Sequence, residues 1–231
     1  MKLLYRCKKL VFIMLFTNLK YSYCQQTIVW NTIQLPVQLS TKWQVPVDFS
    51  YRTIGFSSSA YQYTGRIGIR RYFNDRWSVA TGVALFFTRH TFSKSDSEFG
   101  REFRLWQEAL KEKKLNGKYS LQNRARVEER FFSTTSTNDA YTAVRFRYRL
   151  GLIRMITEKW KIQLSDEYME QLASGKFNFQ QNRASISFAY IFGYLSQVQA
   201  GYIWSELSKS AQHFITLSFQ KSIVLHGTGN K

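Results

Sequence analysis

The chain has 231 residues, enough for one large domain or one barrel, and 17% of them are aromatic. Its formal net charge is +18, but Lys and Arg form no compact cluster beside a reading helix and no nucleic-acid-binding motif is recognisable, so no nucleic-acid partner is expected. The chain has only two prolines and twelve glycines, and these low numbers argue against a disordered chain.

Residues 1–24 are predicted to be a secretory signal peptide. A basic region precedes a short apolar run at residues 10–16, and small residues at positions 22 and 24 allow cleavage before Gln25. The run is shorter than the ~20 residues that a spanning helix needs, so export is favoured over an uncleaved anchor. A lipoprotein anchor on Cys24 is the alternative, which the bulky Tyr23 fits poorly. Cleavage removes Cys7 and Cys24, the two cysteines of the chain, so we expect no disulfide, thiolate metal site or cofactor in residues 25–231.

From residue 28 onward, polar and apolar side chains alternate in eleven segments. Side chains of a β-strand point to opposite faces in turn, so each segment is predicted to be a strand with one polar and one apolar face. The segments are Ile28–Leu39, Lys42–Ile54, Tyr61–Phe73, 77–87, Glu98–Leu110, Lys118–Phe132, Tyr141–Ile153, Trp160–Tyr168, Phe177–Tyr190, 198–204 and 215–219.

Glu98–Leu110 is the ambiguous segment. Phe99, Phe103 and Trp106 also fit helical spacing, so an amphipathic helix is an alternative. A strand is preferred because it gives a charged face like those of the neighbouring segments. Asn116-Gly117 then supplies a turn dipeptide that tolerates positive φ.

Lys118–Phe132 shows the alternation over its full length. One face is charged or polar at every second residue from Lys118 to Arg130, and the other is apolar except at Asn123 and Glu129. In the following segments, three arginines from 145 to 149, then Glu167, and then Arg183 occupy equivalent positions on the polar faces.

The connections are predicted to alternate in length. Short ones fall near residues 40, 74, 116, 157 and 193, and longer polar ones fall at Ser57–Ser59, His90–Ser97, Ser133–Asp139, Leu172–Gly175 and Ser205–Ser210. Short periplasmic turns that alternate with longer outer loops are typical of outer-membrane barrels. Bacterial barrels normally have an even number of strands, so we expect ten or twelve, with either Ile28–Leu39 not a full strand or one strand undetected.

A soluble sandwich would also bury the apolar faces, but three features favour a membrane barrel. The segments reach about eleven to fifteen residues, which suits a tilted crossing of ~9–11 residues plus its rims. Tyr, Trp and Phe recur near segment ends, like the aromatic girdles at the two interfaces of a membrane barrel. The predicted signal peptide accounts for export of the chain toward the outer membrane. The predicted fold is therefore a closed antiparallel transmembrane β-barrel at residues 25–231, in contact with outer-membrane lipid.

Several runs resemble a family of bacterial outer-membrane proteins that is catalogued only as a domain of unknown function (number twenty-four ninety). They are Glu102-Phe-Arg-Leu-Trp-Gln107, Arg124-Ala-Arg-Val-Glu-Glu-Arg-Phe131, Arg145-Phe-Arg-Tyr-Arg-Leu150, Glu167 and Gln181-Asn-Arg183. The resemblance covers nearly all of residues 25–231 and implies an outer-membrane β-barrel with no established activity. The chain departs from the common barrel ending, because residues 221–231 follow Phe219 in place of a final aromatic residue.

The polar faces are predicted to form an internal ladder of ion pairs. In the hairpin around Asn116-Gly117, unlike charges oppose one another if Glu108 faces Arg124, Arg104 faces Glu128 and Glu102 faces Arg130. Glu167 could similarly lie between Arg149 and Arg183. We expect the ladder to comprise Glu102, Arg104, Glu108, Arg124, Arg126, Glu128, Arg130, Arg145, Arg147, Arg149, Glu167 and Arg183.

Two roles for this ladder remain open from the sequence. It either holds a narrow barrel together or lines a narrow pore or cavity that favours a small anionic solute, since arginines outnumber acids. The alternatives are a barrel-embedded enzyme that acts on lipid and a soluble periplasmic ligand-binding β-barrel. No enzyme is expected, because His90, His213 and His226 belong to no recognisable motif, neighbouring carboxylates on a strand point to opposite faces, and metal-ligand spacing is absent.

Overall fold

A computed structural model describes residues 27–56, 60–89, 98–136, 138–193 and 195–225. The predicted signal peptide and the predicted loops Ser57–Ser59 and His90–Ser97 lie outside these ranges. Within them, no helix is long and apolar enough to cross a membrane.

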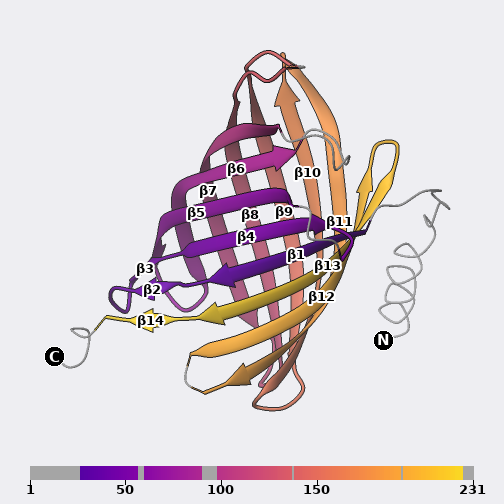
Figure 1. Cartoon of the computed structure of the whole chain (residues 1–231). Helices are drawn as coiled ribbons and strands as arrows, with labels where there is room; N and C mark the ends of the chain where they lie inside the picture. Colours follow the sequence, from indigo (N-terminus) through magenta and orange to yellow (C-terminus); the bar gives the residue numbers. More distant parts are fainter. Residues whose placement is uncertain (1–26, 57–59, 90–97, 137, 194, 226–231) are drawn as a thin grey trace, which may run out of the picture.

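The described residues form a closed all-β barrel of eleven long strands (Figure 1). Each of the eleven predicted segments corresponds to one strand, and Glu98–Leu110 lies in a strand, not in a helix. The strands are β1 (Thr27–Gln34), β4 (Val47–Ile54), β5 (Ala60–Tyr72), β6 (Trp77–Arg89), β7 (Phe99–Lys114), β8 (Tyr119–Phe132), β9 (Tyr141–Met155), β10 (Trp160–Ala173), β11 (Lys176–Phe192), β12 (Ser196–Leu207) and β13 (Ala211–Lys221).

The barrel closes through a parallel pair, β1 and β13. Their register runs from Thr27 beside His213 to Gln34 beside Gln220, whereas the other neighbours among the eleven strands pair antiparallel. A chain that alternates direction at every strand brings its first and eleventh strands together in the same direction. The expected strand number of ten or twelve was therefore wrong, because an odd count can be closed by one parallel pair.

Two prolines interrupt the first hairpin. Pro36 and Pro46 have no backbone N–H for a sheet ladder. Pro36 lies between the end of β1 and the next short strand, and β4 begins directly after Pro46. Beyond the prolines the hairpin continues as the short strands β2 (Val37–Gln38) and β3 (Trp43–Val45). After β13, the chain adds β14 (Ile223–Val224), which pairs in parallel with β2 and lies beside it in Figure 1.

Four short turns at one end of the barrel share one local sequence pattern. Asn74 Oδ1 accepts the amides of Arg76 and Trp77, both at 2.9 Å, and Asn116 Oδ1 accepts those of the second and third residues after it. Ser40 and Thr157 do the same with their hydroxyl oxygens. In every case the second residue after the acceptor is basic and the third is Trp or Tyr, so the motif places an aromatic ring at the start of each following strand.

At the opposite end, two connections are tighter than predicted. Ser174 and Gly175 alone join β10 to β11, and both have positive φ, of 50° and 73°. Two successive residues with positive φ suit the twist of a tight hairpin, so no long loop is needed here. Residues 208–210 alone join β12 to β13, whereas the connection between β8 and β9 is long, as expected.

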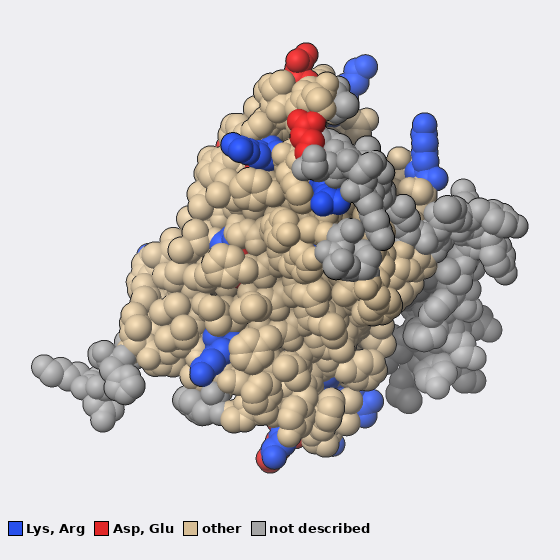
Figure 2. All heavy atoms as spheres, viewed as in Figure 1, with Lys and Arg blue, Asp and Glu red and all other residues tan. Residues whose placement is uncertain are grey.

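The two faces of the barrel wall have opposite chemistry. Large apolar side chains are exposed on the outside, among them Phe49 (54% exposed), Leu85 (50%) and Leu217 (48%). Figure 2 shows a broad surface of uncharged residues, with most Lys, Arg, Asp and Glu toward its margins. Charged side chains are instead buried inside, as Glu128 (2%) and Glu108 (5%) show. This inverts the usual arrangement of a soluble protein, whose buried side chains are mainly apolar.

The parallel seam can be tested by crosslinking. Cysteines introduced by Thr32→Cys and Ser218→Cys occupy paired positions, so mild oxidation should join them and change the gel mobility of residues 25–231, which contain no other cysteine. The control combines Thr32→Cys with Gln220→Cys, which lies two residues out of register. Equal crosslinking of both pairs, or of neither, would contradict the seam.

Candidate functional site

The candidate site is a network of ion pairs in the barrel lumen. Alternation along β7, β8, β9 and β10 points every second side chain inward, and these positions carry the charged residues. Within the described part of the chain, ion pairs join eight arginines to five carboxylates. We call this set the luminal network: Arg66, Arg70, Arg104, Arg124, Arg126, Arg130, Arg145 and Arg147 with Asp48, Glu102, Glu108, Glu128 and Glu167.

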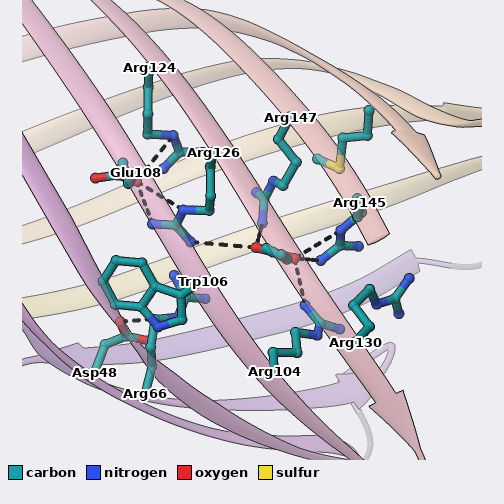
Figure 3. A network of polar contacts seen from close by, with 12 residues as sticks. Asp48, Arg66, Arg104, Trp106, Glu108, Arg124, Arg126, Arg130, Arg145 and Arg147 are labelled. Atoms are coloured by element: carbon teal, nitrogen blue, oxygen red, sulfur yellow. Dashed lines mark hydrogen bonds and ion pairs between the residues drawn. The ribbon is translucent and has the colours of Figure 1, made fainter. Parts of the chain in front are cut away.

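Glu128 of β8 is the centre of the network. It accepts hydrogen bonds from Arg147 Nη1 at 2.6 Å, Arg145 Nε at 2.9 Å and Arg104 Nη1 at 3.3 Å, and Arg126 Nη1 lies 3.7 Å away. Figure 3 shows these four arginines converging from β7, β8 and β9. Several guanidinium donors around one carboxylate compensate for its removal from water.

Glu108 forms a second centre toward the end with the short turns. Arg126 Nη2 lies 2.5 Å and Arg70 Nη2 lies 2.7 Å from its oxygens, and Arg124 Nε is 3.7 Å away. The Arg126 guanidinium also lies 4.9 Å from the ring centre of Trp106, within the range of a cation–π contact. Arg126 therefore links the Glu108 centre to Glu128.

Glu102 and Glu167 complete the chain of contacts. Glu102 binds Arg104, with an Nε to oxygen distance of 2.5 Å, and also binds Arg130. Glu167 binds Arg147, with an Nη2 to oxygen distance of 2.9 Å, and also binds Arg124. Arg147 and Arg104 thus each bridge two carboxylates. The contacts run without interruption through Glu102, Glu128, Glu108 and Glu167, whereas Asp48 and Arg66 form a separate pair.

The predicted register of the β7–β8 hairpin was wrong by two residues. Glu108 lies opposite Arg126, Arg104 opposite Arg130, and Glu128 opposite Trp106. The turn sets this register, because Leu115 pairs with Tyr119 and leaves residues 116–118 as the loop. Arginine side chains are long enough to reach diagonally, so charge balance does not require unlike residues to face each other directly. Arg104 and Arg130 face each other and share Glu102.

The predicted position of Glu167 agrees with the register, which places it between Arg149 and Arg183. Its hydrogen bonds, however, come from Arg124 and Arg147. Within the described residues, Arg149 and Arg183 form no ion pair, and the Nε atom of each is buried without a hydrogen-bond partner. Ten of the twelve predicted ladder residues thus belong to the luminal network.

Sequence reasoning missed Arg70 of β5, which binds Glu108, and the separate pair of Asp48 on β4 with Arg66 on β5. Their alternate positions on polar faces were a signal, but the reach of Arg70 past β6 to Glu108 on β7 depends on the registers of two successive hairpins. Trp106 was also missed as a packing residue. It is 2% exposed and lies against Gly68 and Gly82, where an added Cβ would approach its ring to 2.5 Å and 2.7 Å.

Asn123, one of the two residues that interrupt the apolar face of β8, has a partner on the next strand. The Tyr148 hydroxyl donates to Asn123 Oδ1 at 2.9 Å. The contact satisfies one polar group of each residue on the outer face of the barrel.

The described residues enclose cavities at three levels of the lumen. One of about 420 Å³ lies at the end with the longer loops, one of about 410 Å³ lies toward the short turns, and one of about 250 Å³ lies between them beside Glu167 and Arg147. The luminal network separates the outer two. The interior is therefore filled at mid-height by arginine and glutamate side chains.

Within the described ranges, the carboxylates of the luminal network are engaged in ion pairs, each with at least one arginine. No group of three His, Cys, Asp or Glu residues in these ranges could hold a metal ion. His213 bonds to Tyr202, and His90 and His226 lie outside the described residues.

The fold and the site define a closed β-barrel with an apolar exterior and a charged interior. The family model described as "Protein of unknown function (DUF2490)" matches residues 27–215, and the chain belongs to this family. Among solved structures, the chain is similar to the beta domain of the Bordetella autotransporter BrkA, with 14% identity, 77% of this chain and 79% of that chain covered, and a TM-score of 0.43. No curated protein matches the sequence.

The energetic role of Glu128 can be compared with that of a peripheral carboxylate. Glu128→Gln leaves several buried guanidinium groups short of a countercharge, so we expect it to lower the free energy of unfolding by about 3–5 kcal/mol. Asp48→Asn removes one 3.7 Å pair of more accessible side chains, for which we expect about 0–1 kcal/mol. Urea unfolding of both variants in the same detergent measures the difference. Equal losses would show that Glu128 is not the centre of the network.

Proposed function

We propose that the protein is an outer-membrane β-barrel whose lumen is closed by the luminal network and whose interior favours anions. The observation that carries this proposal is the inverted polarity of the barrel wall. Exposed residues such as Phe49 and Leu85 suit contact with lipid hydrocarbon, whereas the buried charges need an enclosed polar interior. A soluble periplasmic barrel would expose the same apolar wall to water, which disfavours that alternative.

Aromatic residues support a membrane position with the short turns at one interface. Trp43, Trp77, Tyr119 and Trp160 each follow a short turn at the same end of the barrel. Trp and Tyr prefer the membrane–water interface, because their rings are apolar and their N–H or O–H groups still reach water. By analogy with bacterial barrels, this end would face the periplasm and the cavity of about 420 Å³ would face outward.

The luminal network supports a closed barrel more than a diffusion pore. Arg104, Arg126 and Arg147 approach Glu128 from three strands and occupy the space between the outer two cavities. Barrels of about this size leave room inside for little more than their own side chains. The network thus has a structural role, which is to hold the narrow barrel together.

The excess of arginine gives the interior its preference for anions. Eight arginines share five carboxylates in the luminal network, and Arg52, Arg149 and Arg183 add positive charge that no ion pair within the described residues balances. Surplus positive charge in a low-dielectric lumen attracts small anions and repels cations.

Two measurements test the proposal. In cell fractionation the protein should sediment with the outer membrane and migrate differently on gels before and after boiling, because folded membrane barrels resist unheated detergent. In planar bilayers it should show little or no conductance, and any current should favour chloride over potassium. A soluble protein without a heat-dependent shift would contradict membrane insertion, and a large nonselective conductance would contradict the closed lumen.

A further inference from the structure

Arg52 and Arg183 lie on the same two aromatic rings at the closure of the barrel. The Arg52 guanidinium carbon is 3.7 Å from the ring centre of Trp30 and 5.9 Å from that of Phe214. For Arg183 the corresponding distances are 5.9 Å and 5.6 Å. The rings come from β1 and β13 and the arginines from β4 and β11, so the parallel seam assembles this group of four side chains.

No carboxylate is paired with these two arginines within the described ranges. The Nε atoms of both are buried and have no hydrogen-bond partner. Glu167, the register neighbour of Arg183, is bound by Arg124 and Arg147. A cation–π contact stabilises a guanidinium by less than the cost of burying its charge without a counterion, so the stacking on Trp30 does not account for the pair.

Both guanidiniums border the cavity of about 420 Å³ at the end with the longer loops. The carboxylate in its described lining, Glu102, is bound by Arg104 and Arg130, so the cavity has a net positive lining. Its volume lies in the range of small-molecule sites.

We propose that Arg52 and Arg183 bind the phosphate group of a phosphomonoester in this cavity. Two unpaired guanidiniums match the charge of about −1.5 to −2 that a phosphomonoester carries at neutral pH. The planar guanidinium fork also matches the spacing of two phosphate oxygens. Chloride, a single atom, offers no such pair of acceptors. The inference rests on the proposed anion-favouring interior and specifies the anion and the residues that hold it.

Isothermal titration calorimetry of the detergent-extracted protein with inorganic phosphate and with phenyl phosphate tests the site. We expect Arg52→Gln and Arg183→Gln each to weaken phosphate binding by about tenfold or more, because each removes charge-assisted hydrogen bonds. Arg71→Gln is the matched control. Arg71 is an exposed arginine that lies 5.4 Å from the Trp43 ring and 5.3 Å from the Phe73 ring, so its loss changes the net charge equally but should leave binding unchanged.

A second pair of variants covers the case in which the glutamine variants fail to fold. Arg52→Lys and Arg183→Lys keep the charge but lose the bidentate fork, and we expect intermediate affinities. The inference is overturned if the folded wild-type protein binds no phosphate, if it binds phosphate no more tightly than chloride, or if the folded variants at both positions bind like wild type.

Vesicles distinguish a lipid headgroup from a soluble phosphomonoester as the natural source of the phosphate group. Phosphatidylcholine vesicles that contain phosphatidic acid should lower the apparent affinity for free phosphate if the natural ligand is a lipid headgroup, and should leave it unchanged if the ligand is soluble. The gel shift on boiling separates the two proposals. A barrel that shows the shift but binds no phosphate rejects this site alone, whereas a protein without the shift rejects the proposed membrane barrel.

Discussion

The burial of charge inside a narrow barrel is the constraint on which the rest of this structure depends. Glu128 is 2% exposed and would be costly to bury alone, but guanidinium groups of Arg104, Arg145 and Arg147 reach it from neighbouring strands. Each of those strands must therefore keep its register and keep its charged face toward the lumen. Because the charged groups occupy the interior, the large apolar side chains point outward, and the same alternation that satisfies the lumen produces a wall suited to lipid.

Closure by a parallel pair has consequences beyond the strand count. It places β1 next to β13, so Trp30 and Phe214 form an edge-on pair with ring centres 6.1 Å apart. It also brings Arg52 of β4 near the Phe214 ring and Arg183 of β11 near the Trp30 ring. A barrel with ten or twelve strands would close through an antiparallel pair and would not assemble this group in the same way. The short strands β2, β3 and β14 extend the wall beyond the two prolines, which separate β1 from β2 and β3 from β4.

The strands and the direction of their faces could be predicted from the sequence, because period-two alternation is a local property of segments such as Lys118–Phe132. The β7–β8 register could not, because it depends on how many residues Asn116 closes into its loop and on the reach of arginine side chains. The contact of Arg183 on β11 with Trp30 on β1 joins strands far apart in the chain. Such contacts follow only from the way the barrel closes.

Fluorescence quenching by brominated lipid tests the inverted polarity most directly. Variants that retain a single tryptophan would be refolded into vesicles whose acyl chains carry bromine. Trp160, 48% exposed on the outer wall, should be strongly quenched, whereas Trp106, 2% exposed in the lumen, should be nearly unaffected. Equal quenching of the two, or stronger quenching of Trp106, would contradict a barrel with a lipid-facing apolar wall and a closed charged interior.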